Sequence, residues 1–450
     1  MPWHFIGIGG DGMSALARVL HERGLSVRGS DLRENARTRA LRGLGIPVRV
    51  GHDPAHVRSG DPVAVVYSSA IRPDNVELAA ARQARFPVYH RQEVLGQLLR
   101  SRRTVGVAGT HGKTTTSAMV AALLLEAGKD PTFLVGAPTP SLGGRHGRWG
   151  RGEWLVAEID ESDGFFTQFP TEIAVVTNVG CDHLNHYGDE EALLRGFARF
   201  VSRSRRVVLC ADDPHTPFLK EFARDVYTFG IESDSADLQA HDIEQHRART
   251  RARLAFRGEP LGELELEIPA PGAHNVKNAL AALLAGHLVG LEFPAMLAAL
   301  RRFQLPERRF QILEENGLVI VDDYAHLPEQ IEANLVAARE GWRPKRLIAL
   351  FQPHRYTRMS YLNGAFARAL RRADLVIVTD IYPAFEDPIP GVDARSVVEA
   401  LRREHEGVHY LRGFEETYEF LRKRAEPGDF LIGFGPGDVW QVLHRLVREG

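Results

Sequence analysis

The chain has 450 residues, which at about 150 residues per domain predicts three domains or two large ones and excludes a single small binding module. Hydrophobic residues make up 44% and charged residues 25%, as in folded proteins with sizeable cores, so disorder is not the main state of the chain. The 56 Lys and Arg residues nearly balance 58 Asp and Glu residues. The formal net charge of -2 argues against a protein that coats nucleic acid or anionic lipid, and we expect small-molecule partners and no nucleic acid.

The cysteines and the apolar runs indicate the compartment. Cys181 and Cys210 cannot form a framework of several disulfides, and neither has a metal-site spacing, which favours the reducing cytoplasm. The first residues lack the basic and apolar regions of a signal peptide. The longest apolar run, 119–125, is far below the roughly 18 residues of a membrane span. We therefore expect a cytoplasmic protein without a membrane partner, and no feature points to an obligate protein partner.

Residues 1–98 alternate short apolar runs with helical patterns, as strand–helix–strand units do. The expected strands are 4–8, 26–28 and 62–67, and a helix is expected at 13–22. A basic, polar hinge at 100–103 follows. We place the first domain at 1–98.

The first glycine-rich turn has the sequence Gly7-Ile8-Gly9-Gly10-Asp11-Gly12 and stands between a strand and a helix. This GxGxxG spacing lets backbone amides and a helix N-terminus approach a pyrophosphate. Asp31 ends the next strand, in position for a ribose hydroxyl. On this segment alone a nicotinamide-dependent dehydrogenase is an open interpretation, and so is a tight turn without a ligand.

Residues 99–303 form the expected second domain. Apolar runs with β-branched residues predict buried parallel strands at 104–108, 154–159 and 173–177, and a helical stretch covers 278–289.

A second glycine-rich segment, Gly109-Thr110-His111-Gly112-Lys113-Thr114-Thr115, lies between the strand 104–108 and the apolar helix 118–127, as a phosphate loop does. Val107 stands where the full pattern has its first glycine. Only 6 of the 56 basic residues are lysines, and Lys113 is the first of them. We expect Lys113 to hold the β and γ phosphates of a nucleotide and Thr114 to bind magnesium. The alternative is a glycine-rich turn with an incidental lysine.

Two further polar segments follow expected strands of this domain. Glu158-Ile159-Asp160-Glu161-Ser162-Asp163 ends one strand, and 178–183 ends the next with Asp182 and His183. Polar groups at the carboxyl ends of adjacent parallel strands converge on one crevice. Glu158 and His183 are therefore expected to complete the coordination of a divalent metal that Thr114 begins. The alternative for 158–163 is a solvated acidic turn.

The segment His274-Asn275-Val276-Lys277-Asn278 opens the last helix of the second domain. One interpretation of Asn275 is that it serves only as the N-cap of this helix. A polar, proline-containing linker at 303–309 leads to the third domain, 304–450. Its expected strands are 318–321, 347–351, 375–379 and 430–434.

Each strand of the third domain is followed by polar residues, which we expect to gather at one rim. The four segments are Asp322-Asp323-Tyr324-Ala325-His326, 352–358, 380–382 and 433–438. Within 352–358, Arg355 and Arg358 are three residues apart and suit bidentate capture of a carboxylate or phosphate. The alternative is that Arg355 and Arg358 are ordinary solvated surface arginines, because the chain is rich in arginine.

Taken together, the motifs resemble the Mur ligase family, most closely its branch that adds L-alanine to UDP-N-acetylmuramate. Seven segments in chain order carry the resemblance: GIGGDGMS at Gly7, GTHGKTTT at Gly109, EIDESD at Glu158, TNVGCDH at Thr177, GAHNVKNALAA at Gly272, DDYAHLP at Asp322 and FQPHRYTR at Phe351. They span almost the whole chain.

The resemblance implies an α/β fold of three domains: an N-terminal Rossmann-like domain for the UDP-sugar, a central P-loop ATPase with a mainly parallel sheet, and a C-terminal Rossmann-like domain for amino acid and nucleotide. It implies that ATP, with Mg2+, phosphorylates the lactyl carboxylate of UDP-N-acetylmuramate, and that the amine of L-alanine attacks the acyl phosphate. It also implies a place in cytoplasmic peptidoglycan precursor synthesis, and thus in cell-wall biogenesis, cell shape and division.

The resemblance also implies four sets of site residues. The ATP set is Gly109, Thr110, His111, Gly112, Lys113, Thr114, Thr115, Asn275, Asn278, Asp323 and Tyr324. The UDP-sugar set is Gly7, Gly9, Gly10, Gly12, Met13, Ser14 and Asp31. The metal set is Thr114, Glu158 and His183. The catalytic set is Lys113, His183, His326, His354, Arg355 and Arg358.

Three other functions stay open on the sequence. A recycling ligase would add a peptide to UDP-N-acetylmuramate instead of an amino acid. A dehydrogenase would explain the first glycine-rich turn and Asp31 but would leave Lys113 without a role. A non-catalytic ATP-dependent switch or scaffold would explain the phosphate loop alone.

Overall fold

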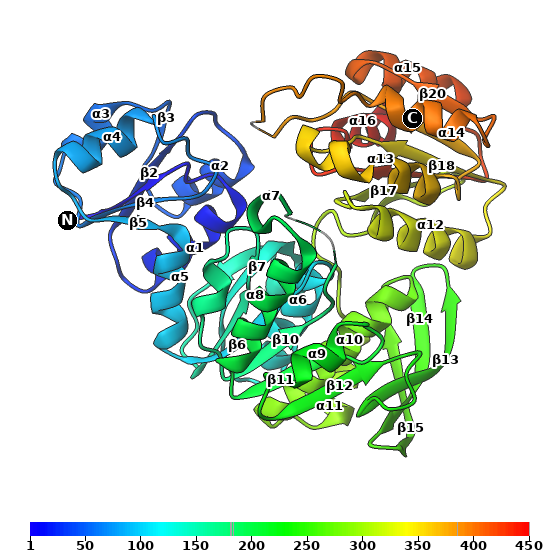
Figure 1. The fold of residues 1–450 in the computed structure, drawn as a ribbon, viewed down its shortest axis with the longest axis horizontal. Coiled ribbons are helices and arrows are strands. Elements are labelled where there is room, and N and C mark those ends of the chain that lie inside the picture. Colours follow the sequence, from blue (N-terminus) through cyan, green and yellow to red (C-terminus); the bar gives the residue numbers. More distant parts are fainter. Residues whose placement is uncertain (181, 183, 385, 450) are drawn as a thin grey trace. The chain divides into compact units, whose positions relative to one another are not determined.

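The computed structural model of the chain describes residues 1–180, 182, 184–384 and 386–449. Within these residues the strands form three mainly parallel sheets with helices on their faces, which confirms the expected three-domain α/β fold class (Figure 1). By contacts the chain divides into two compact units. The first is Met1–His241, Leu254–Leu264 and Lys277–Phe303, and the second is Asp242–Arg253, Glu265–Val276 and Gln304–Gly450. The domain limits expected at 98 and 303 stay predictions.

The first sheet and its helices occupy residues 3–100. In chain order the elements are β1 (Trp3–Ile6), α1 (Asp11–Glu22), β2 (Val27–Asp31), α2 (Ala36–Gly43), β3 (Val48–Val50), α3 (Pro54–Arg58), β4 (Ala64–Tyr67), α4 (Val76–Gln83), β5 (Val88–His90) and α5 (Arg91–Arg100). The strand order is β3-β2-β1-β4-β5, with parallel pairing throughout the described strands. Because strand side chains alternate, Phe5 joins the buried cluster that includes α1 and Ile6 joins the one that includes α4.

The second sheet has the phosphate-loop strand near its centre. In chain order the elements are β6 (Arg103–Ala108), α6 (Lys113–Glu126), β7 (Thr132–Thr139), η1 (Pro140–Leu142), β8 (Arg145–Arg148), β9 (Trp154–Glu158), η2 (Phe165–Gln168), β10 (Ile173–Val176), α7 (Leu184–Tyr187), α8 (Glu190–Ser202), β11 (Arg206–Cys210), α9 (Thr216–Lys220), β12 (Val226–Gly230), β13 (Leu238–His246), β14 (Arg249–Phe256), β15 (Glu259–Ile268), α10 (Ala273–Val289) and α11 (Phe293–Leu300). Their order is β15-β14-β13-β12-β11-β10-β6-β9-β7-β8.

This order corrects one expectation. The strands that end at Glu158 and before Asn178 were expected to be adjacent, but β6 lies between β9 and β10 and pairs in parallel with both. The reason is that chain order does not fix spatial order in a parallel sheet, because each crossover can pass a strand by. The phosphate loop, which follows β6, therefore has a polar strand end on each side.

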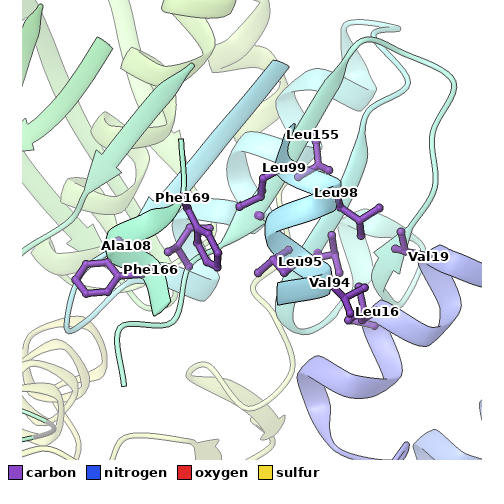
Figure 2. Packing of buried hydrophobic residues seen from close by; sticks show 14 of the residues in the cluster. Leu16, Val19, Val94, Leu95, Leu98, Leu99, Ala108, Leu155, Phe166 and Phe169 are labelled. Atoms are coloured by element: carbon purple, nitrogen blue, oxygen red, sulfur yellow. The ribbon is translucent and has the colours of Figure 1, made fainter. Parts of the chain in front are cut away.

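Helix α5 joins the cores of the first and second sheets. Figure 2 shows its apolar side chains Val94, Leu95, Leu98 and Leu99 in one buried cluster with residues of α1, β9 and the segment after η2: Leu16, Val19, Leu155 and Phe169. Burying one such side chain stabilises a fold by about 1.5–3 kcal/mol. Within the first compact unit, the first and second sheets thus share a single core.

The third sheet occupies residues 311–449 with its helices. In chain order the elements are β16 (Gln311–Glu314), β17 (Val319–Asp323), α12 (Pro328–Trp342), β18 (Arg346–Phe351), α13 (Tyr356–Leu370), β19 (Leu375–Val378), α14 (Arg395–Arg402), β20 (Val408–Tyr410), α15 (Gly413–Arg424), β21 (Asp429–Phe434) and α16 (Trp440–Glu449). The order is β16-β17-β21-β18-β19-β20, and β16 pairs antiparallel. Along β18, Leu347, Ala349 and Phe351 pack with α12–α14, and Ile348 and Leu350 pack with α15 and α16.

Among the described residues, none of the helices combines the length and the apolar character that crossing a membrane requires.

Candidate active site

The phosphate loop, residues 109–115, has two backbone positions that suit glycine. Gly109 has φ 129° and Gly112 has φ 79°, both in the left-handed region. A Cβ at Gly109 would lie 2.2 Å from Thr177 Oγ1, and one at Gly112 would lie 2.3 Å from Asn278 Oδ1. The loop is therefore packed against the end of β10 and against α10. This packing brings Asn278, a residue expected at the nucleotide, directly to the loop.

Helix α6 begins at Lys113, immediately after this loop. Its N-cap, Gly112, supplies no side-chain hydrogen bond to the first turn. Backbone amides and the helix dipole favour an anion at such a position. Asn178 fixes the loop from β10, because its Oδ1 accepts from His111 N at 2.9 Å and its Nδ2 donates to His111 O at 3.1 Å. The loop is thus held in a form suited to phosphate.

Lys113 lies in a buried polar environment. Its Nζ donates to Gly109 O at 2.6 Å and to Glu161 Oε1 at 2.9 Å. Burial would lower the pKa of Lys113, but the carboxylates of Glu161 and Glu158 hold it above its usual value. Burial raises the pKa of Glu161 to about 7, and the Lys113 ammonium opposes part of this rise. Glu161 is a site residue that the sequence interpretation missed.

Two of the three expected metal ligands converge on one point of β7. A Cβ at Gly136 would lie 2.5 Å from Thr114 Oγ1 and 2.4 Å from Glu158 Oε2. Glu158 Oε2 is buried and has no hydrogen-bond partner among the described residues. A hydroxyl oxygen and a carboxylate oxygen without a hydrogen-bond partner, both facing one space, fit the oxygen ligands that Mg2+ prefers. The third expected ligand, His183, lies outside the described residues.

Gly136 gives a direct test of this metal site. We expect Gly136→Ala to raise the Mg2+ concentration for half-maximal turnover by about tenfold or more, because the new methyl group would displace Thr114 or Glu158 from its position. The measurement is nucleotide-driven phosphate release across a Mg2+ titration. Gly43→Ala is the matched control, because a Cβ at Gly43 meets no atom within 4 Å. An unchanged Mg2+ dependence in Gly136→Ala would place the metal elsewhere.

The first glycine-rich turn is fixed by the strand beside it. The amides of Gly7 and Ile8 donate to Ser30 O at 2.9 Å each, and Gly9 N donates to Asp31 Oδ2 at 2.8 Å. Gly7 has φ 72°, and Gly10 is the N-cap of α1 without a side-chain bond. The Asp31 carboxylate therefore orders the turn. A contact between Asp31 and a ribose stays a prediction.

Gly12 permits a close contact that the sequence did not indicate. A Cβ there would lie 1.8 Å from Arg91 Nη1, so the Arg91 guanidinium lies directly over Gly12. Arg91 Nη2 also donates to Asp160 Oδ2 at 3.1 Å. Arg91 thus links the first glycine-rich turn to the acidic segment after β9. Nothing in so Arg-rich a sequence distinguishes this arginine from the others.

Met13 and Ser14 of the expected UDP-sugar set have buried side chains, with exposed fractions of 2% and 1%. Ser14 Oγ donates to Gly10 O at 2.8 Å and is hydrogen-bonded to His146 Nε2 at 2.9 Å. Burial lowers the pKa of His146 to about 4, with Arg37 as a second cause, so the ring is neutral at pH 7. The side chains of Met13 and Ser14 therefore pack at the start of α1, and a contact of these two residues with the UDP-sugar stays a prediction.

Helix α10 corrects the N-cap interpretation of Asn275. The helix begins at Ala273, so Asn275 lies inside its first turn. Asn275 is buried and its Nδ2 donates to Pro271 O at 2.7 Å. The helix starts earlier than expected because Gly272, at φ 87°, turns the chain just before Ala273.

In the second compact unit, Asp323 is the last residue of β17 and Tyr324 follows it. The buried Asp323 carboxylate accepts from Phe310 N and Ala325 N, each at 2.6 Å, and burial raises its pKa to about 6. The Arg309 guanidinium lies 4.8 Å from the Tyr324 ring centroid, a cation–π distance. Arg309 is another cation at the site that the sequence interpretation did not select. A nucleotide contact of Asp323 stays a prediction.

The remaining expected catalytic residues of this unit form one cluster. The rings of His326 and His354 have centroids 5.8 Å apart. Arg358 is 4% exposed, and its Nη1 donates to His354 Nδ1 at 3.0 Å and to His354 O at 3.2 Å. Arg355 precedes α13, and its Nε is buried without a hydrogen-bond partner among the described residues. The structure thus brings His326, His354 and Arg358 together, with Arg355 beside them in the chain.

Comparison with known proteins assigns the chain to a family. Residues 2–103 match the family model for the Mur ligase family, catalytic domain, residues 107–286 that for the Mur ligase middle domain, and residues 308–437 that for the Mur ligase, glutamate ligase domain. The chain is 42% identical over 453 residues to the UDP-N-acetylmuramate–L-alanine ligase of Pelotomaculum thermopropionicum, which covers 99% of this chain and 97% of that protein. The chain belongs to the Mur ligase family.

Solved structures of other Mur ligases have the same fold. The UDP-N-acetylmuramate-alanine ligase of Thermotoga maritima is 32% identical, with a TM-score of 0.87 over 100% of this chain and 99% of that chain. A murein peptide ligase from Psychrobacter arcticus is 22% identical, with a TM-score of 0.72 over 100% of this chain and 98% of that chain, and this likeness concerns the fold alone. The resemblance found in the motifs is confirmed.

Proposed function

We propose that this Mur ligase joins L-alanine to the lactyl carboxylate of UDP-N-acetylmuramate, at the expense of ATP and through an acyl phosphate. The observation that carries the proposal is the phosphate loop. In it, Lys113 and the start of α6 lie near the Thr114 and Glu158 oxygens that face one space at Gly136. Such an arrangement suits transfer of a phosphoryl group from a nucleotide.

The loop residues act on the nucleotide. The first-turn amides of α6 and the Lys113 ammonium hold the β and γ phosphates, and Lys113 offsets the charge that rearranges as the lactyl carboxylate attacks phosphorus and ADP leaves. Thr114, Glu158 and His183 would hold Mg2+, which supplies further positive charge to the phosphates. Asn275 and Asn278 contact the nucleotide from α10. Phosphate is a far better leaving group than a carboxylate oxygen, which is why the acid is activated first.

The second step uses the amino acid. The amine of L-alanine attacks the acyl carbon, the bond to phosphate breaks, and the amine loses a proton to give the amide. We assign His326, His354, Arg355 and Arg358 to the amino acid and the reacting phosphate. A guanidinium binds a carboxylate through two parallel hydrogen bonds, which suits the carboxylate of a free amino acid.

The full-length relatives favour this activity over the alternatives. The relatives named as L-alanine ligases match at about 40% identity over nearly the whole chain, whereas the murein peptide ligase is 22% identical. A dehydrogenase leaves the phosphate loop unexplained, and absence of NADH binding in a fluorescence titration would exclude it. The proposed cytoplasmic location rests on the small number of cysteines.

The decisive experiment measures phosphate release from ATP with Mg2+ across a panel of L-alanine, L-serine, glycine and a peptide. We expect release to require both UDP-N-acetylmuramate and an amino acid, with L-alanine preferred. Release that needs neither would favour an ATP-dependent switch. Release that needs the peptide would favour a recycling ligase.

Arg355, the N-cap of α13, and Arg358, in its first turn, are expected to bind the carboxylate of the amino acid. At least one of Arg355→Ala and Arg358→Ala is expected to raise the KM for L-alanine more than tenfold with little change in ATP affinity. The reason is that the variant loses a guanidinium that binds the carboxylate of the amino acid through two hydrogen bonds. Steady-state kinetics with each substrate varied in turn measure both effects. Alanine amide, which lacks the carboxylate, is expected to be a poor substrate. If both variants lose ATP binding equally and keep the alanine KM, these arginines belong to the nucleotide site.

A further inference from the structure

The loops after two neighbouring strands of the third sheet are joined by their backbones. Strands β18 and β19 are adjacent, and His354 after the first forms an isolated parallel bridge with Tyr382 after the second. Arg355 N donates to Tyr382 O at 3.0 Å, and Tyr382 N donates to Pro353 O at 2.8 Å. The His354 and Tyr382 rings stack with centroids 6.1 Å apart and an interplanar angle of 13°. Tyr382 therefore supports, through its backbone and its ring, the loop that carries Arg355 and Arg358.

The start of α13 is poorly stabilised by its own residues. Arg355 is the N-cap, with φ 71° and ψ 137°, and it forms no side-chain cap bond. A guanidinium has donors only and cannot accept from first-turn amides, so arginine is unsuited to cap a helix N-terminus. A positive φ in a residue with a Cβ persists only where the surroundings hold it. Arg355 thus depends on contacts from outside its own helix.

Glu386 supplies the missing cap. Its Oε2 accepts from Thr357 N at 3.0 Å, and its Oε1 accepts from Thr357 Oγ1 at 2.7 Å. Thr357 is the second residue of α13, whose amide an N-cap side chain would normally bind. A carboxylate at this end also interacts favourably with the helix dipole. Glu386 reaches Thr357 because the chain turns at Ala384, with φ 48°, and Glu386 N donates to Pro383 O at 3.0 Å.

We propose that Glu386 is a positioning residue of the amino-acid pocket: by capping α13 from the neighbouring loop, it holds Arg355 in its positive-φ conformation and keeps Arg358 against His354. The proposal rests on the proposed function, in which these residues bind L-alanine. Arg358 directly follows Thr357 and is buried against His354, so a frayed first turn would move both its guanidinium and that of Arg355.

The kinetic test compares Glu386→Ala with Glu386→Gln. Glu386→Ala is expected to raise the alanine KM by about tenfold, in line with the loss of a helix cap, with kcat and the ATP KM changed by less than about threefold. Glu386→Gln keeps one oxygen that accepts from Thr357 N, and its KM is expected to lie between those of wild type and Glu386→Ala. A role in stability alone would lower the active fraction, and hence kcat, without a selective change in the alanine KM.

Two variants serve as controls. Thr357→Val removes the hydroxyl bond and keeps the amide bond, so its effect on the alanine KM is expected to be smaller than that of Glu386→Ala and not additive with it. Glu399→Ala removes an exposed glutamate of α14 and is expected to leave the alanine KM unchanged. Thr357→Val and Glu386→Gln also keep the test decisive if Glu386→Ala fails to fold.

Hydrogen exchange followed by mass spectrometry separates this proposal from the proposed function. Faster exchange in the peptide around 355–360 of Glu386→Ala, with unchanged exchange in β21, is expected whether or not the protein uses L-alanine. Unchanged exchange at 355–360 overturns the capping role. Faster exchange with an unchanged alanine KM, in a wild type that does use L-alanine, overturns the role in the pocket. A wild type without L-alanine-dependent phosphate release contradicts the proposed function instead.

Discussion

Replacing Lys113 by alanine is expected to reduce ligase turnover about 100-fold or more, the usual cost of losing a positioned charge that acts in the transition state. In the structure the Lys113 ammonium is fixed by Gly109 O and Glu161, so its position does not depend on the flexible lysine chain alone. The measurement is the initial rate of phosphate release with both substrates saturating, beside a circular dichroism spectrum. We expect the fold to survive.

Lys129→Ala is the matched control, since Lys129 is an exposed lysine just after the same helix. It is expected to keep the wild-type rate. If Lys113→Ala retains more than about a tenth of the wild-type rate, an effect below roughly 1.4 kcal/mol, the assignment of Lys113 to the phosphates is wrong.

Glu161 decides how the Lys113 variant is interpreted. With the ammonium removed, the buried Glu161 loses the charge that opposes the rise of its pKa, so its pKa rises further above about 7 and the carboxyl takes up a proton at neutral pH. Glu161 is then neutral in the variant, so the loss of rate does not come from a buried charge on Glu161. The double variant with Glu161→Gln is expected to have the same rate as Lys113→Ala, whereas recovery of activity would show that the rate loss comes from Glu161.

The sequence predicts the phosphate loop well because that feature is local. The strand, the glycines and Lys113 follow one another within about a dozen residues, and the left-handed conformations of Gly109 and Gly112 need no distant information. The position of Glu161 against Lys113 is different. The segment 158–163 contains several carboxylates, and which one meets the lysine depends on how the chain turns after β9, a property of the assembled sheet.

Strand β14 was missed for a physical reason. In β14 the arginines, such as Arg251, are exposed and the intervening residues, such as Ala252, are buried, so the strand alternates with a period of two and has no apolar run. A search for apolar runs passes over such polar strands. Arg91 and Glu386 were missed because their contacts join distant parts of the chain, Arg91 to Asp160 and Glu386 to Thr357, through long side chains.

Glu158→Gln is expected to lower turnover about 100-fold at a Mg2+ concentration that saturates the wild type, and to shift the Mg2+ dependence to higher concentration. The substitution keeps the size of the side chain and removes its negative charge, and Mg2+ binds a carboxylate much more strongly than an amide. Because Glu158 Oε2 has no hydrogen-bond partner among the described residues, its loss breaks no internal bond there, and we expect the fold to be unchanged. Initial rates across a Mg2+ titration measure both effects.

Glu153→Gln is the matched control because Glu153 directly precedes β9, whose last residue is Glu158, and its side chain is 63% exposed. It is expected to keep both the rate and the Mg2+ dependence. If Glu158→Gln lowers the rate equally at every Mg2+ concentration, Glu158 acts on the nucleotide or the acid directly and not through a metal. If Gly136→Ala shifts the Mg2+ dependence in the same direction as Glu158→Gln, the two results together place the ion between Thr114 and Glu158, since a methyl group at residue 136 crowds both oxygens at once.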